Sequence, residues 1–180
     1  MDTLTPVTEI LLVALVVTGA VYDVKFRRIP NWLTILGVVA GFAVNAFSFG
    51  VAGLGRAGLG CALALLIYVP LFALRAMGGG DVKLMAAVGS IAGPNDWFVV
   101  FVVTAIVGGI MALGLLCLRG GLGRAVRNVL GILSTVVRFR APFRSNPAVD
   151  VSHSSAVTLP HGVSIAIGSL LFLALRHYAP

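Results

Sequence analysis

The stretch WFVVFVVTAIVGGIMALGLLCL, at positions 97–118, decides the fold, because it holds no charged residue over a length that can cross a bilayer. A transmembrane helix needs about 20 consecutive apolar residues. The whole chain agrees, since 59% of its 180 residues are hydrophobic and 11% are charged. Ordinary soluble domains have roughly 45–50% and about 25%. A soluble fold could not bury this much apolar surface, so we predict an integral membrane protein.

Similar apolar runs recur along the chain, separated by short polar joints or joints rich in glycine and proline. We predict one all-α domain over residues 1–180, a polytopic membrane protein with about six transmembrane helices. They are expected at about 5–24, 32–50, 57–75, 76–93, 97–118 and 158–177. Acidic residues precede the first run, so it is interpreted as a helix and not as a cleaved signal peptide.

Lysine and arginine gather in alternate joints, and cytoplasmic loops collect these residues. Placing the first joint in the cytoplasm puts eleven of the thirteen basic residues on that side and leaves Arg56 and Arg176 outside. We therefore expect both termini to be external. The net charge of +7 needs no nucleic acid partner, because no basic stripe interleaved with aromatic residues is present.

One long connection, 119–157, is not uniformly polar. Between residues 122 and 139 its apolar residues recur at helical spacing, with arginines on the opposite side. This pattern is typical of an amphipathic helix that lies in the membrane interface, near anionic lipid headgroups. A water-exposed helix packed on the protein is the alternative.

Asp23 and Asp81 are the two acidic residues that do not fall at obvious water-facing places. The apolar stretches beside them, 10–22 and 82–92, are too short to cross a membrane alone, so each helix must extend through its aspartate. Both carboxyls are then at the cytoplasmic edge of the hydrocarbon, where ionisable groups are costly and usually functional. The alternative is that each aspartate only pairs with a nearby cation, or that Asp81 caps the helix that follows it.

A run of three glycines, 78–80, directly precedes Asp81. Such a run is costly in backbone entropy unless the chain bends sharply or something must approach its backbone. Here it would leave the N–H groups of a helix N-terminus free for a peptide or an oxyanion. A flexible hinge is the alternative.

Two neighbouring carboxyls cannot both ionise easily, so one keeps its proton while the other acts as a base. The base would take a proton from a water that attacks a peptide carbonyl, and the protonated partner would protonate the leaving amine. No Ser/His pair competes, and His153, His161 and His177 have no second metal ligand at suitable spacing. We predict that Asp23 and Asp81 are catalytic, with no metal and no cofactor.

Three segments resemble the type IV prepilin peptidases, the membrane aspartic proteases that remove the leader peptides of pilin precursors. Residues 78–84, GGGDVKL, resemble the family's GxGD motif. Residues 23–34, DVKFRRIPNWLT, resemble its first aspartate motif, and residues 159–168, LPHGVSIAIG, are similar to its final-helix pattern of Pro, a ring residue and Gly. The three segments occur in the order that the family has.

The resemblance implies an aspartic endopeptidase of the bacterial inner membrane that cleaves prepilins at the cytoplasmic face. It implies these site residues: the catalytic pair Asp23 and Asp81, the motif glycines Gly78 and Gly80, and the supporting residues Lys83 and Asn31. No paired CxxC motifs precede the first helix, unlike in full-length members. The chain therefore resembles the short branch associated with Flp or tight-adherence pili, and we expect proteolysis without methyl transfer. The expected partners are a prepilin, with a basic leader and an apolar helix, and anionic lipids.

A small proton-coupled transporter is the main alternative function, because intramembrane carboxyls also relay protons. It predicts an inverted repeat between the two halves of the chain, and the sequence shows none. A purely structural role in an assembly is the third alternative, and it would tolerate Asp→Asn changes at both positions.

Overall fold

The structure, a computed structural model, describes residues 4–74, 77–118 and 161–178. These residues form five α-helices and no strand: α1 (Pro6–Phe26), α2 (Asn31–Ala73), α3 (Gly79–Ala92), α4 (Pro94–Leu118) and α7 (His161–Tyr178). The prediction of an all-α fold is confirmed. The whole connection at 119–157, including the amphipathic helix predicted at 122–139, lies outside the described residues.

Three of the described helices are long and apolar enough to cross a membrane, namely α1, α2 and α4. This agrees with an all-α membrane protein, but the six separate spans that we predict are not found. The ranges 32–50 and 57–75 both belong to α2, and α3 has only 14 residues. At about 1.5 Å per residue, α3 is about 21 Å long, which is shorter than the roughly 30 Å hydrocarbon core.

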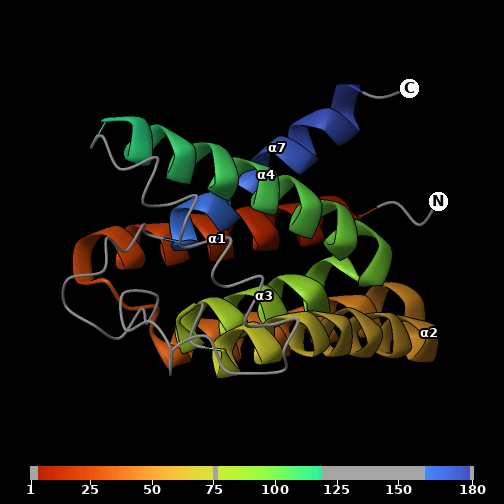
Figure 1. The fold of residues 1–180 in the computed structure, drawn as a ribbon. Helices are drawn as coiled ribbons and strands as arrows, with labels where there is room; N and C mark the ends of the chain where they lie inside the picture. Colours follow the sequence, from red (N-terminus) through yellow and green to blue (C-terminus); the bar gives the residue numbers. More distant parts are fainter. Residues whose placement is uncertain (1–3, 75–76, 119–160, 179–180) are drawn as a thin grey trace, which may run out of the picture.

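The helix α2 is interrupted at a single residue, Gly50, whose φ of 60° and ψ of −139° are not helical. Glycine adopts this conformation without the clash that a Cβ would cause. The joint that we predict between the second and third spans, at 50–56, is helical from residue 51 onwards, because the one glycine is enough to redirect the chain. Beyond it Gly53 lies against Asn45 and Gly58 faces Phe42, so the two halves of α2 lie side by side. Figure 1 shows this hairpin.

The helix α3 packs against both halves of α2, and eleven of its 14 residues are buried. The backbones approach closely at two places. One is Gly41 beside Ser90, and the other is Gly60 beside Gly89, where an added methyl group would collide with backbone atoms. The helix α3 is therefore the core of this part of the molecule.

The helices form two layers, one of α2 and α3 and the other of α1, α4 and α7 (Figure 1). In the second layer Gly168 of α7 packs directly on Thr104 of α4. Between the layers, Leu84 of α3 reaches Gly19 of α1. Because Asp23 belongs to α1 and Asp81 to α3, the two aspartates come from different layers.

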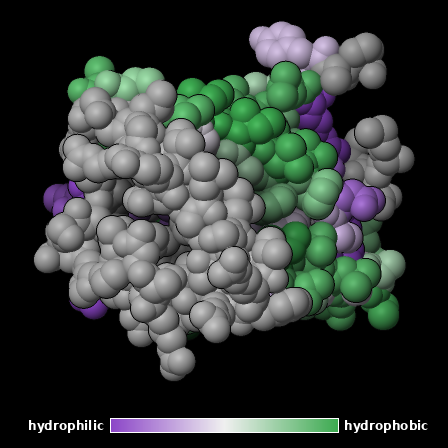
Figure 2. All heavy atoms as spheres, viewed as in Figure 1, coloured by the Kyte–Doolittle hydropathy of each residue, from purple (hydrophilic) through white to green (hydrophobic). Residues whose placement is uncertain are grey.

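Hydrophobic side chains gather on the outer surface of α4 and α2 on the face shown in Figure 2. Exposed examples on α4 are Phe98, Val102, Ile106 and Ile110. A contiguous apolar surface of this kind is unfavourable in water and favourable against lipid chains. The outer surface therefore agrees with a position in a bilayer.

One end of the bundle carries an ion cluster in which Asp96 accepts hydrogen bonds from two arginines. The Oδ2 atom of Asp96 lies 3.0 Å from the Arg176 Nη1 and 3.3 Å from the Arg56 Nη2. These are the two basic residues that the sequence assigns to the external side, and the structure brings them together. Three further features lie at this same end, namely the bend in α2, the N-terminal end of α1 and the C-terminal end of α7 (Figure 1).

Candidate active site

Asp23 lies in the last turn of α1, which extends to Phe26 as the sequence predicts for a helix that must pass through its aspartate. The helix ends because Arg27 takes a left-handed conformation, with φ of 52°, and donates its backbone N–H to the Asp23 carbonyl oxygen at 2.9 Å. The side chain of Asp23 is half-buried. Its Oδ2 atom accepts the backbone N–H of Gly162, the second residue of α7, at 2.8 Å.

Asp81 lies in the first turn of α3 and has an exposed fraction of only 9%. The N-cap residue of α3 is Gly78, and its cap position has no side-chain hydrogen bond. Asp81 is therefore not the N-cap residue, because α3 begins two residues before it, but its carboxyl interacts with the backbone N–H of Gly78 and so contributes to capping this end. A carboxylate in the first turn of a helix is favoured by the helix dipole, which compensates part of the cost of its burial.

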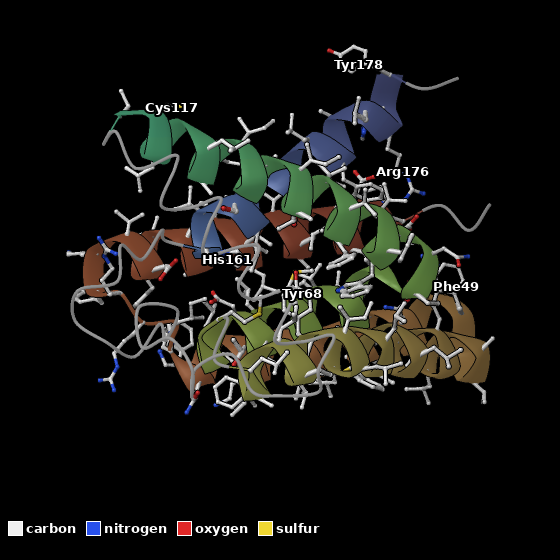
Figure 3. All side chains as sticks on the ribbon, in the orientation of Figure 1. Phe49, Tyr68, Cys117, His161, Arg176 and Tyr178 are labelled. Atoms are coloured by element: carbon white, nitrogen blue, oxygen red, sulfur yellow. The ribbon has the colours of Figure 1, made fainter. Side chains whose placement is uncertain are left out.

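The structure brings Asp23 and Asp81 together at one end of the bundle, close enough for the charge of Asp23 to act on Asp81. This end is opposite to the Asp96 cluster, because Asp81 lies in the first turn of α3 and Ala92, its last residue, accepts a hydrogen bond from Arg56. The charge of Asp23 also acts on His161, and that of Asp81 acts on Tyr68. Figure 3 labels Tyr68 and His161, which lie between the two layers.

The sequence patterns predict no role for Tyr68 or Gly162, and none for His161, which has no second metal ligand at suitable spacing. Tyr68 is buried, with its ring edge-on to Trp97 and Phe101 at centroid distances of 6.2 and 5.9 Å. No local pattern could have identified it, since it lies on another helix from either aspartate. His161 and Gly162 belong to the final segment that resembles the family pattern, and this resemblance is the sequence feature that could have pointed to them.

The motif glycines occupy crowded positions. An added methyl group at Gly78 would lie 3.3 Å from Oδ2 of Asp81, and one at Gly80 would lie 3.2 Å from Cβ of Ile29. Both distances are tighter than ordinary van der Waals contact. Gly78 therefore leaves room for the carboxylate, and Gly80 lets the segment between α1 and α2 pass over the start of α3.

The two residues with predicted supporting roles contact each other directly. Lys83 of α3 donates from Nζ to Oδ1 of Asn31, the first residue of α2, at 2.8 Å. Both side chains are exposed. The contact joins the segment after the first aspartate to the helix that carries the second.

The site residues thus lie on the segments that best resemble one family, and a comparison of the chain with family models agrees. Residues 10–113 match the type IV leader peptidase family. The chain belongs to this family. The match covers more than half of the chain, including both aspartates and the glycine run, and ends before α7. Comparisons with curated proteins and with solved structures gave no match. Membership of this leader peptidase family indicates a protease, and the all-α membrane fold suits it.

Proposed function

We propose that this leader peptidase is a membrane-embedded aspartic endopeptidase that removes the leader of Flp-type prepilins, with Asp23 and Asp81 as its catalytic pair. The observation that carries the proposal is that these two carboxyls, from different layers of the bundle, lie close enough for the charge of one to act on the other. They are separated by 58 positions in the sequence, so local structure does not explain their proximity. An aspartate that served only a surface loop would lie in water, so the burial of Asp81 favours a functional role.

The chemistry follows from the shared environment of the two carboxyls. Two negative charges close together repel, so the pair holds one proton at working pH. The ionised carboxylate takes a proton from a water, whose oxygen forms a bond to the scissile carbonyl carbon. The protonated carboxyl donates a hydrogen bond to the carbonyl oxygen and then gives its proton to the leaving amine as the C–N bond breaks.

The position of the pair suits a prepilin, which has a basic leader followed by an apolar helix. A substrate helix in the bilayer presents its leader junction at the membrane surface, so a protease acting on it needs its carboxyls at that level. The basic residues of the connections near Asp23 and Asp81 favour the cytoplasmic side for this end. The protein then lies in a bacterial inner membrane with the Asp96 end external. The N-terminal end of α1 and the C-terminal end of α7 are on that external side.

The test is co-expression of this peptidase with a candidate Flp-type prepilin, scored by the change in mobility of the precursor. Asp23→Asn and Asp81→Asn are each expected to abolish cleavage, because an amide can neither accept the water's proton nor supply one. Asp96→Asn is the matched control, because it makes the same change at the opposite end of the bundle and should leave cleavage intact. Membrane levels are measured for all three variants. If Asp23→Asn or Asp81→Asn reaches the membrane and still cleaves at the normal rate, the pair is not catalytic.

A further inference from the structure

The first turn of α7 touches the candidate pair, although α7 lies outside the part of the chain that matches the family. The Gly162 N–H donates to Oδ2 of Asp23 at 2.8 Å, across 139 positions of sequence. The contact is partly buried, so water competes for it less than at an open surface. Among the described residues this is the hydrogen bond that joins the Asp23 side chain to another helix.

A side chain at position 162 would push the Asp23 carboxylate away. A Cβ built there would lie 3.0 Å from both Cβ and Oδ2 of Asp23, and 3.2 Å from its Cγ. Gly162 is itself buried, so there is little free space into which α7 could retreat. The close approach of backbone to carboxylate therefore needs a glycine at this position, for reasons of space and not of backbone conformation.

The contact also suits the polarity of both partners. The first N–H groups of a helix have no acceptor inside the helix, and the helix dipole makes them a favourable site for a carboxylate. The Gly162 N–H therefore finds in the Asp23 side chain an acceptor that α7 itself does not offer.

We infer that the first turn of α7 belongs to the active site, with Gly162 as a positioning residue that holds the Asp23 carboxyl in place. The inference rests on the proposed function, because it concerns the same catalytic pair. Displacement of Asp23 would then slow the reaction without changing how the substrate binds. The region responsible lies about 50 residues beyond the end of the family match.

The kinetic test is Gly162→Ala, assayed with the Flp-type prepilin in membranes. Displacing the Asp23 carboxyl should lower kcat on the order of 10- to 100-fold, with little change in KM, because the substitution acts on Asp23. The rate is expressed per folded molecule in the membrane. Gly109→Ala is the matched control, because no described atom lies within 4 Å of its added methyl group.

Two kinetic results would overturn the inference. One is a Gly162→Ala enzyme with the kcat and KM of the unmodified protein. The other is a rise in KM with kcat unchanged, which would mean that the first turn of α7 binds substrate instead. A purely structural loss lowers the amount of folded enzyme without changing kcat per folded molecule, and so gives the first result.

A second measurement needs neither activity nor the Gly162→Ala variant. Asp23→Cys and Gly162→Cys are combined in a chain in which Cys61 and Cys117 are replaced by Ala. A Cβ at position 162 would lie 3.0 Å from the Cβ of Asp23, so the two segments need to separate by about 0.5 Å to reach the roughly 3.5–4.5 Å that a disulfide requires. Mild oxidation should protect both thiols of the pair from maleimide, while either single cysteine stays reactive.

Failure of the cysteine pair to form would overturn the contact between α1 and α7 and with it the inference. If the unmodified protein does not cleave the prepilin, the proposed function fails instead, whatever the cysteine pair does. The two failures are therefore distinguishable.

Discussion

Asp81 is held by the packing of the α2–α3 layer, whereas Asp23 is held by a backbone hydrogen bond from α7. The helix that carries Asp81 is buried along almost its whole length and meets α2 backbone to backbone at Gly60 and Gly89. The helix that carries Asp23 has only five buried residues, and its aspartate lies in the terminal turn. The comparison indicates that one carboxyl is fixed by the core and the other by a segment from the far end of the chain. Changes in the first layer should therefore act on stability, and changes at the start of α7 should act on rate.

The largest expected effect on stability is that of Gly60→Ala. The added methyl group would collide with the backbone of Gly89, and a backbone clash cannot be relieved by a change of rotamer. We expect a loss of about 3 kcal/mol, at the upper end for overpacked cores, measured as a lower melting temperature in detergent. Gly55→Ala on the same half of α2 is the control, since its methyl group meets no described atom within 4 Å. Equal melting temperatures for the two variants would show that the close packing of α2 on α3 does not determine the stability of this layer.

A smaller loss is expected for Asn45→Ala. The Ser90 carbonyl oxygen would normally accept the N–H of residue 94, but that residue is Pro94 and has none. Asn45 Nδ2 supplies a donor instead, at 3.0 Å from Ser90 O and 3.1 Å from Ile91 O. Removing it leaves buried carbonyls without this donor, which should cost about 2 kcal/mol.

Thermal unfolding in detergent measures this loss, with Asn95→Ala as the control because Asn95 is exposed. The rate per folded molecule should stay near that of the unmodified protein. A large fall in that rate would show that the α2–α3 layer also sets the chemistry, which would contradict the division between the two layers.

The smallest effect is expected for Lys83→Ala. Its hydrogen bond to Asn31 is exposed, and exposed polar contacts compete with water, so the loss should stay below about 1 kcal/mol. Asn31→Ala should lower stability by a similar amount, and the double variant should lose no more than either alone. Fully additive losses would show that the contact between α2 and α3 contributes nothing.

The sequence allowed the helical class, the membrane environment and the two aspartates to be predicted, because apolar runs and isolated acids are local features. The division into spans was less accurate. Residues 50–56 look like a joint, yet Gly50 alone turns the chain and the helix resumes at once. Likewise, the 76–93 range begins too early, because α3 starts only after the cap at Gly78.

Part of the candidate site could not be predicted, because it depends on contacts between distant segments. The Gly162 hydrogen bond to Asp23 spans 139 positions, and no spacing rule covers such a distance. Tyr68 is found near Asp81 only because α2 folds back at Gly50. The Lys83 contact with Asn31 follows from the packing of α3 on α2, whereas the resemblance implied only that both residues matter.

The short length of α3 has a consequence for one of the reactants. A hydrolase consumes water, and the hydrocarbon core of a bilayer contains almost none. A helix of about 21 Å falls short of a core of roughly 30 Å by about 9 Å, which is about three water diameters. If the end of α3 that lies near Asp96 is at the outer surface, the missing length falls at the end that carries Asp81. Polar groups and water can fill the space there. On the proposed function, the short helix would then give water access to the depth of Asp81 without a separate channel.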